Sequence, residues 1–152
     1  MKKTIFAALA AAGLAAFANP PGFTDDYNEA LARAAREEKA VLAVFSGSDW
    51  CGWCIKLDDE FLSKPEFTKA VEKDLVLLYV DMPRDTSRLN VKAASVNPKL
   101  VKRYGIKGFP SLRFLDGRGR VLGVAERDMS ASPGEWGRAL VAEAKRLLAK
   151  RQ

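Results

Sequence analysis

The sequence of 152 residues contains no histidine and only two cysteines, Cys51 and Cys54. Zinc sites and iron–sulfur clusters commonly take about four ligands from the protein, so such a centre would need a second copy of this chain. A disulfide between cysteines three positions apart closes a very small loop and stabilises little by loop entropy, which disfavours a purely structural bond. With a metal centre and a structural disulfide both disfavoured, reversible redox chemistry is the favoured role of the cysteine pair.

No apolar stretch reaches the roughly 20 residues that a membrane-spanning helix needs. The segment 5–17 is apolar, follows Lys2 and Lys3, and leads into the small-x-small sequence at 16–18. This pattern predicts a secretory signal peptide over residues 1–18, removed on export, and one domain over residues 19–152. A membrane anchor is the alternative, which the length disfavours. We expect a secreted protein of the bacterial periplasm that is not held at the membrane after cleavage.

Neither a strong net charge nor a low hydrophobic content sets this chain apart, with 48% hydrophobic and 29% charged residues. Such a composition is typical of a globular protein and argues against extended disorder. The net charge falls from +6 to +4 without Lys2 and Lys3, because residues 1–18 contain no acidic side chain. Basic residues gather near the C-terminus, where a solvated helix face is the simpler interpretation, so no nucleic-acid partner is expected.

Two unbroken apolar runs, at 40–45 and 75–80, predict strands that are buried on both faces. Between them, Cys54, Leu57 and Phe61 recur at helical spacing. This spacing predicts a helix that starts at Cys51 and turns its acidic residues 58–60, together with Lys56, toward solvent. Strand, helix and strand in this order predict a parallel crossover.

The flanking segments complete an α/β order. Thr24 is expected to cap a helix at the start of the domain, and Ser63 to begin a capping box for a helix that ends near residue 73. Residues 84–96 are expected to be an irregular loop, followed by a short helix over 99–104 that Asn97-Pro98 caps and Gly105 ends.

An antiparallel hairpin is predicted for the last strands, over 111–115 and 120–124, around the turn Asp116-Gly117-Arg118-Gly119. Ser132 begins a capping box with proline at the first helical position, which predicts a C-terminal amphipathic helix. The predicted order is helix, β-α-β, helix, β-β-α.

Two motifs carry a family resemblance: Trp50-Cys51-Gly52-Trp53-Cys54, placed between the first strand and its helix, and Gly108-Phe109-Pro110-Ser111, placed before the hairpin. Together they resemble the thioredoxin family, in particular its secreted bacterial thiol–disulfide oxidoreductases, over most of the mature chain. The resemblance implies an α/β fold with a central four-stranded mixed sheet flanked by helices, here with an extra N-terminal helix.

The resemblance also implies roles for individual residues. In the family, the first cysteine attacks, the second resolves the mixed disulfide, and a cis proline lies against the sulfurs; these roles fall on Cys51, Cys54 and Pro110. The backbone of the residue before the proline, here Phe109, would pair with the substrate peptide. Trp53 is expected on an apolar rim that faces the substrate. Support for the site is expected from two further residues of the motif, Trp50 and Gly52, although Trp50 could equally be a packed residue.

The reactive species in disulfide exchange is the thiolate, so the site must lower the pKa of one sulfur. The start of a helix favours negative charge at Cys51 more than at Cys54, which lies one turn further in. We therefore expect an exposed attacking sulfur and a buried resolving sulfur. Because the chain has no histidine, we expect only a moderate effect on the thiolate, which favours a reductase over a strong oxidant.

Two departures from the family leave questions open. Many thioredoxins carry a buried acid on the first strand that moves protons at the second cysteine, whereas this strand reads Ala43-Val44-Phe45. Proton transfer at Cys54 would then depend on water, Asp49 or Lys56. The Gly-Trp pair between the cysteines differs from the Gly-Pro of cytosolic thioredoxins, so the direction of electron flow is open, and oxidant and isomerase roles are alternatives. A non-catalytic binding or chaperone-like module with an inert disulfide is the competing hypothesis.

The sequence shows no nicotinamide or flavin fingerprint. We therefore expect no cofactor beyond the Cys51–Cys54 disulfide itself. Electrons would then arrive from another dithiol protein and pass to the thiols and disulfides of protein substrates, with this chain acting as a monomer.

Overall fold

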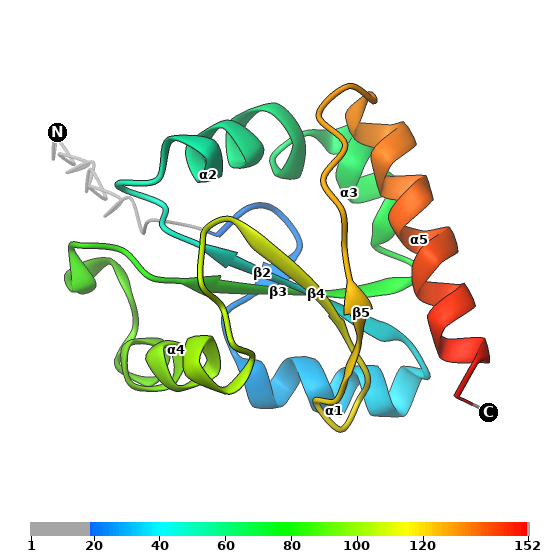
Figure 1. Cartoon of the computed structure of the whole chain (residues 1–152), viewed down its shortest axis with the longest axis horizontal. Helices are drawn as coiled ribbons and strands as arrows, with labels where there is room; N and C mark the ends of the chain where they lie inside the picture. The colour runs from blue at the N-terminus through cyan, green and yellow to red at the C-terminus, as the bar shows by residue number, and fades with distance from the viewer. Residues whose placement is uncertain (1–18, 152) are drawn as a thin grey trace, which may run out of the picture.

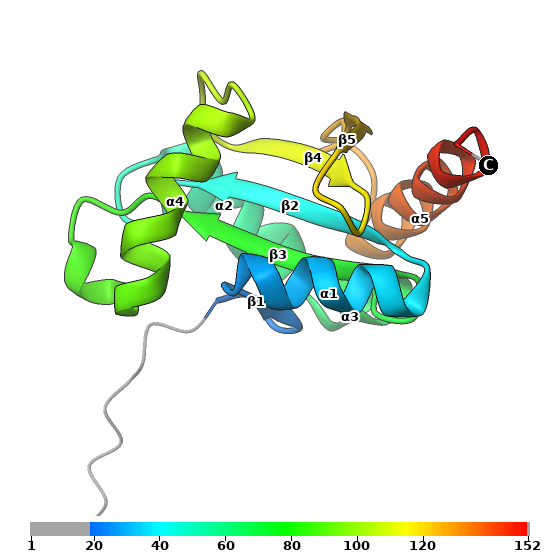
Figure 2. The same cartoon turned by 90° about the horizontal axis from the view of Figure 1, so that it is seen from below.

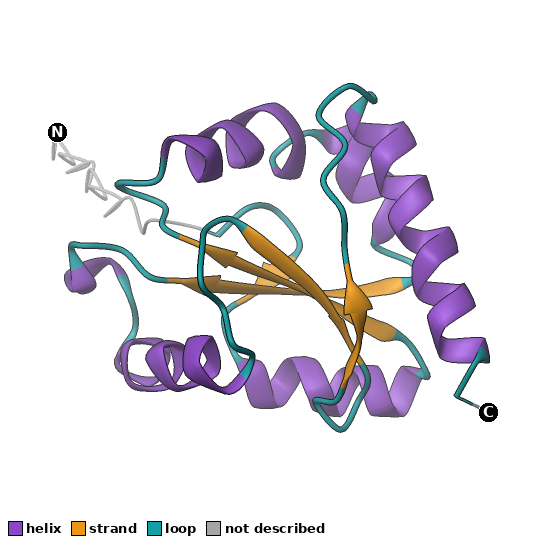
Figure 3. Ribbon diagram, viewed as in Figure 1, coloured by secondary structure: helices purple, strands orange, loops and turns teal. Residues whose placement is uncertain are grey.

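The computed structural model describes residues 19–151, so the predicted signal peptide lies outside the described residues. One mixed sheet runs through the centre in the strand order β1-β3-β2-β4-β5 (Figures 1 and 3). Strands β1, β3 and β2 are parallel, whereas β4 is antiparallel to β2 and to β5. The strands span β1 (Phe23–Thr24), β2 (Ala40–Ser46), β3 (Leu75–Asp81), β4 (Ser111–Leu115) and β5 (Val121–Val124).

Helices cover both faces of this sheet. Helices α2, α3 and α5 lie on one face, and α1 and α4 lie on the other (Figures 1 and 2). Their bounds are α1 (Tyr27–Glu37), α2 (Gly52–Leu57), the wider π-helical turn η1 (Asp58–Leu62), α3 (Pro65–Val71), the 3₁₀ turn η2 (Thr86–Arg88), α4 (Val91–Arg103) and α5 (Pro133–Ala149). Within residues 19–151, none of these helices has the length and apolar character to cross a membrane.

The two central strands divide the core into two clusters. Because successive side chains of a strand point to opposite faces, Leu42 and Val44 pack beneath α3 and α5, whereas Val41 and Phe45 pack toward α1 and α4. All seven residues of β2 and all seven of β3 are buried. The prediction of central strands covered on both faces is confirmed.

The predicted four-stranded sheet is wrong by one strand. Phe23 and Thr24 form β1, which pairs in parallel with Leu77 and Leu78 at the edge of the sheet. Thr24 is therefore a strand residue, and the N-cap of α1 is Asp26, whose carboxylate accepts the Glu29 backbone N–H at 3.0 Å. A strand of two residues is too short to produce a periodic pattern, so the sequence offered no signal for it.

The predicted capping box at Ser63 is also wrong. Helix α3 has Lys64 at its N-cap, without a side-chain hydrogen bond, and Pro65 in its first turn. Ser63 instead ends the preceding π-helical turn, where its backbone N–H donates to the Asp58 carbonyl at 2.9 Å. The fixed φ of proline suits the start of a helix, so Pro65 sets this boundary without a capping side chain.

Much of the segment predicted as an irregular loop at 84–96 is helical. The carboxamide of Asn90 accepts the Ala93 backbone N–H at 2.8 Å and caps α4, which continues through Pro98. A proline inside a helix usually marks a break, and this rule misplaced the start at Asn97. Asn97 is buried, and its side chain donates to the Asp81 carbonyl at 2.8 Å, which fastens α4 to the end of β3.

The last part of the chain follows its prediction. Strands β4 and β5 form the antiparallel hairpin, Gly105 adopts the left-handed backbone with φ of 59° just after α4, and Ser132 forms a full capping box with Glu135 at the start of α5. This order places three features at one end of the sheet: the loop after β2, the end of β3 and the segment before β4.

Candidate active site

The two cysteines lie at the start of α2, where the turn after β2 becomes helical. Cys51 is the N-cap, with extended backbone, and its Sγ accepts the Cys54 backbone N–H at 3.2 Å. The two residues form a disulfide with their Cα atoms 5.1 Å apart. The predicted helix start at Cys51 is confirmed, and it gives the first sulfur an N–H donor from the first turn of α2.

The two sulfurs differ in their surroundings. Cys51 is 8% exposed and Cys54 is 0% exposed. Cys54 is buried as predicted, and its Sγ accepts the Gly47 backbone N–H at 3.4 Å. Cys51 is the more accessible of the two, but it is less open than expected because the Phe109 carbonyl oxygen lies 3.5 Å from its Sγ.

The segment before β4 lies against the disulfide. The Phe109–Pro110 peptide bond is cis, as the resemblance predicts, and Pro110 is buried. The Phe109 ring is partly buried and meets the Trp50 ring edge to face, with 5.7 Å between the centroids. The chain therefore brings residues 50–54 and 109–110 together, although more than 50 positions separate them in the sequence.

The two tryptophans of the motif have different environments. The Trp50 indole N–H donates to the Met82 carbonyl at 2.8 Å, and the Arg84 guanidinium lies 5.8 Å from the ring centroid. Trp53 is 60% exposed, with the Lys56 ammonium 5.5 Å from its ring centroid. Trp50 therefore braces the loop as well as bordering the site, whereas Trp53 presents its ring to solvent. Gly52 is exposed, with open space where a Cβ would stand.

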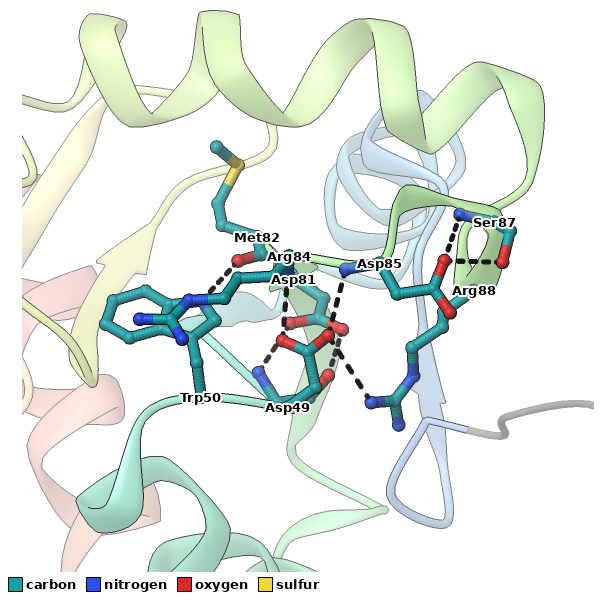
Figure 4. A network of polar contacts seen from close by, with 9 residues as sticks. Asp49, Trp50, Asp81, Met82, Arg84, Asp85, Ser87 and Arg88 are labelled. Atoms are coloured by element: carbon teal, nitrogen blue, oxygen red, sulfur yellow. Dashed lines mark hydrogen bonds and ion pairs between the residues drawn. The ribbon is translucent and has the colours of Figure 1, made fainter.

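A polar network holds the loop after β3 to the loop that carries Cys51 (Figure 4). The carboxylate of Asp49 accepts the backbone N–H groups of Arg84 and Asp85 at 2.9 and 3.0 Å, and it lies 3.8 Å from the Arg88 guanidinium. The backbone N–H groups of Asp85 and Arg84 hold the pKa of the Asp49 carboxyl below its usual range. Asp49 thus serves the loop at 84–88, and Lys56 lies over Trp53, so the structure does not bring these two residues to Cys54 as proton carriers.

A second network connects the helical segment after Cys54 to strands β2 and β3. The Tyr79 hydroxyl donates to Asp58 Oδ2 at 2.5 Å, and its oxygen forms a second hydrogen bond with the Ser46 hydroxyl at 2.8 Å. Asp58 was predicted to face solvent, but it is partly buried and points toward β3. The prediction failed because it grouped Asp58 with its exposed acidic neighbours, residues 59 and 60. Asp58 lies four residues after Cys54 and therefore shares a helix face with it.

This environment changes the acidity of both groups. Burial raises the pKa of the Asp58 carboxyl from 3.8 to about 6, and the charges of Asp81 and Asp59 add to the rise, while the Tyr79 hydrogen bond opposes it. Burial, followed by the charge of Asp58, also raises the pKa of the Tyr79 hydroxyl. Asp58 is therefore a carboxyl that changes its charge close to neutral pH.

The polar side chains around Asp58 border a cavity of about 400 Å³. Tyr79 and Asp81 line it from β3, and Ser48 from the loop before Cys51. Among residues 19–151 there is no group of three or more His, Cys, Asp or Glu side chains that could hold a metal ion.

Comparisons with known proteins agree with this geometry. Residues 27–130 match a family model described as a thioredoxin-like domain. The chain is 35% identical over 98 residues to the disulfide bond reductase DsbH of Chlamydia pneumoniae, covering 64% of this chain and 58% of that protein. It is 45% identical over 56 residues to the thioredoxin-related protein DsbJ of the same organism, covering 37% of this chain and 16% of that protein. The matched part thus spans less than two thirds of either curated relative.

Solved structures extend the likeness over more of the chain. A structure of a DsbH oxidoreductase has a TM-score of 0.68 and 29% identity, and covers 87% of this chain and 90% of that chain. A thioredoxin from Thermus thermophilus has a TM-score of 0.52 and 22% identity, and covers 82% of this chain and 85% of that chain. The second match bears on the fold alone.

Proposed function

The chain belongs to the thioredoxin-like family of thiol–disulfide oxidoreductases, and we propose that it is an exported member that reduces disulfide bonds in other proteins. The observation that carries the proposal is the Cys51–Cys54 disulfide at the start of α2, with the cis Phe109–Pro110 bond beside it. Cys51 is the proposed attacking residue and Cys54 the resolving one.

The reducing direction has two supports. The relative at 35% identity is named a disulfide bond reductase. The sequence has no histidine to stabilise the Cys51 thiolate strongly, and a strongly stabilised thiolate is what makes a dithiol protein an oxidant. A donated N–H from Cys54 at 3.2 Å is a weaker source of stabilisation.

The reaction proceeds in two exchanges. The Cys51 thiolate attacks one sulfur of a substrate disulfide, and the other substrate sulfur leaves as a thiolate. Cys54 then attacks Cys51 Sγ, releases the second substrate sulfur and closes the disulfide, so two electrons pass to the substrate. The unequal exposure of the sulfurs supports this order, because a substrate meets Cys51 more readily than Cys54.

The proposed substrate contacts lie on the rim around Cys51. An extended peptide would pair with the backbone at Phe109, next to Pro110, and pack against the exposed ring of Trp53. Gly52 leaves space beside the sulfur, because it carries no side chain. An upstream dithiol protein would return electrons to the pair, and the apolar segment after Lys2 and Lys3 supports export to the periplasm. No resident cofactor beyond the disulfide and no nucleic-acid partner are part of the proposal.

Reduction of insulin by dithiothreitol, followed by turbidity, tests the activity. Cys51→Ser should abolish the catalysed reaction, and Cys54→Ser should accumulate mixed disulfides with substrates. A Cys51→Ser variant that retains activity, or a wild-type disulfide that dithiothreitol does not reduce, would overturn the proposal; the second outcome would favour an inert binding module.

Equilibration in glutathione and dithiothreitol buffers tests the direction. A reductase should have a potential nearer to about −270 mV than to the roughly −120 mV of a strong oxidant. A value at the oxidising end would keep the family assignment but refute the proposed direction of electron flow.

A further inference from the structure

Asp58 is the unexpected residue of the site, because it places a carboxyl on the sheet side of the helix that carries Cys54. Its Oδ2 accepts the Tyr79 hydroxyl at 2.5 Å, while its Oδ1 is buried and has no hydrogen-bond partner among the described residues. A buried carboxylate oxygen without a donor is unfavourable, and a protonated carboxyl relieves that penalty by carrying one charge less. The site is therefore suited to a group that gains and loses a proton.

The position of Asp58 relates it to the resolving sulfur. Residues four apart on a helix lie one above the other, and the Asp58 backbone N–H donates to the Cys54 carbonyl. On the sheet side, Gly47 donates its backbone N–H to Cys54 Sγ, and the adjacent Ser46 bonds to Tyr79 through its hydroxyl. Polar groups thus continue from the immediate surroundings of Cys54 Sγ to the Asp58 carboxyl.

The strand that carries a buried acid in many thioredoxins has Phe45 among its apolar residues here, fully buried on the face opposite Ser46. Among the alternatives that the sequence suggested, Asp49 bonds to the loop at 84–85 and Lys56 lies over Trp53. Asp58 is instead the carboxyl that the fold places one helical turn after the resolving cysteine, with its side chain turned toward β3.

We propose, on the basis of the proposed thiol–disulfide exchange, that Asp58 receives the proton of the Cys54 thiol in the resolving step and returns it when the disulfide is reduced. In the resolving step, the Cys54 proton passes to the Asp58 carboxylate, and Cys54 Sγ forms its bond with Cys51 Sγ. The bond between Cys51 and the substrate breaks, and the substrate leaves as a thiolate that takes a proton from water. In the reverse step, Cys54 leaves Cys51 as a thiolate and takes the proton from the Asp58 carboxyl.

The cavity beside Asp58 supplies the connection to solvent. It is lined by Asp58 and Tyr79, and its lining includes neither Trp53 nor Phe109, on which a substrate is proposed to bind. A substrate on that rim therefore leaves the cavity open, and Asp58 exchanges its proton through the cavity. Other titratable or charged groups that face this space are Tyr79, Asp25, Asp59, Asp81 and Arg88.

The Asp58 carboxyl has a pKa near neutrality, raised to about 6 by burial, which suits a general acid and base. The fraction that is ionised, and so able to accept the Cys54 proton, increases as pH rises through this value. The rate of the resolving step should therefore rise through pH about 6 in the wild-type protein.

The test isolates the resolving step. Reduced protein is mixed with a disulfide-bonded peptide, quenched with acid at intervals, and the mixed disulfide on Cys51 is quantified by mass spectrometry from pH 5 to pH 8. Asp58→Asn keeps the shape and an acceptor for Tyr79 but cannot titrate. It should slow resolution by about tenfold or more at pH 7, since positioned general bases contribute at least that much, and should remove the inflection near pH 6.

Two further variants separate a proton carrier from a packing residue. Glu60→Gln makes the same chemical change on the exposed side of the same helical segment and should behave as the wild type. Tyr79→Phe removes the hydrogen bond that lowers the Asp58 pKa, so it should move the inflection to higher pH, and it tests the proposal even if Asp58→Asn does not fold.

An Asp58→Asn protein that resolves with the rate and pH profile of Glu60→Gln would overturn the relay, as would an inflection that Tyr79→Phe leaves in place. These outcomes are distinct from failure of the proposed function. In that case no mixed disulfide would form on Cys51 in the wild type or in any variant.

Discussion

Replacing Asp58 with asparagine should stabilise the oxidised protein at neutral pH while it impairs the reaction. Folding raises the pKa of this carboxyl from 3.8 to about 6, so between these values the folded state holds a proton that the unfolded state has lost. The contribution of Asp58 to the free energy of unfolding is fully present below pH about 4, and it is lost as pH rises to about 6. Above pH 6 both states are ionised and the loss is constant.

The size of the effect follows from the same two values. One pKa unit corresponds to about 1.4 kcal/mol, so a rise in pKa from 3.8 to about 6 corresponds to about 3 kcal/mol. Because Asp58 is only partly buried, screening by solvent reduces this figure to about 1–2 kcal/mol. Asp58→Asn should therefore match the wild type near pH 4 and exceed its free energy of unfolding by about 1–2 kcal/mol at pH 7 to 8.

Urea denaturation of both oxidised proteins at intervals from pH 4 to pH 8 measures this difference. Comparing variant with wild type cancels the carboxyls whose pKa is lowered by folding, such as Asp26 and Asp116, because both proteins contain them. Glu60→Gln should show no such pH-dependent gain. A difference between Asp58→Asn and the wild type that is the same at pH 4 and pH 8 would refute the reasoning, since a neutral packing effect has no reason to follow the ionisation of Asp58.

Three other substitutions test separate parts of the structure. Phe67→Ala, which empties a fully buried site against Trp136 in the larger core cluster, should lower the free energy of unfolding by about 3–5 kcal/mol in urea, and a loss under 1 kcal/mol would contradict this packing. Asp49→Ala removes the acceptor of the backbone N–H groups at 84–85, so hydrogen exchange should accelerate there and not in β2; unchanged exchange would refute the anchoring role. Trp53→Ala should change stability by less than about 0.5 kcal/mol but raise KM for insulin, because its ring is exposed, and an unchanged KM would remove Trp53 from the proposed substrate rim.

Apolar pattern predicted the central sheet well, for a physical reason. Strands β2 and β3 are buried on both faces, so each appears in the sequence as a nearly unbroken run of apolar residues. The turn that carries the cysteines lies between these two runs. The hairpin and the cap of α5 were also predictable, because turn residues and the capping box act locally. Interactions within a few residues of one another are visible in the sequence.

Elements that depend on distant partners were not predictable in this way. Strand β1 is defined by its pairing with Leu77 and Leu78, and two residues carry no pattern of their own. Helix α4 continues through Pro98 because its N-cap and its tertiary contact, Asn90 and Asn97, hold the segment on either side. The spacing of the cap and the buried residues Ala93 and Leu100 was a usable signal, but the proline rule outweighed it.

The residues of the candidate site also differ in whether a local pattern in the sequence could identify them. Cys51 and Cys54 were identified from a local motif, and the resemblance placed Pro110 beside them. The carboxyl at Asp58 was missed because its hydroxyl partner, Tyr79, is 21 positions away, on a strand whose other residues gave only an apolar pattern. Spacing of four residues from Cys54 was the one available sign that Asp58 shares the face of the resolving cysteine.

The partly buried carboxyl of Asp58 and the Cys51–Cys54 disulfide are supported by the same face of the central sheet. Ser46 and Tyr79 occupy positions where the alternation of β2 and β3 would place core side chains, and both point to the same face as Cys54. An apolar pair at these two positions would remove the hydroxyl that donates to the Asp58 carboxylate, and it would therefore increase the cost of burying that charge. Local rules of burial are broken where we propose that the second sulfur exchanges a proton. The first sulfur accepts the Cys54 backbone N–H, lies against Phe109 and is the one proposed to meet the substrate.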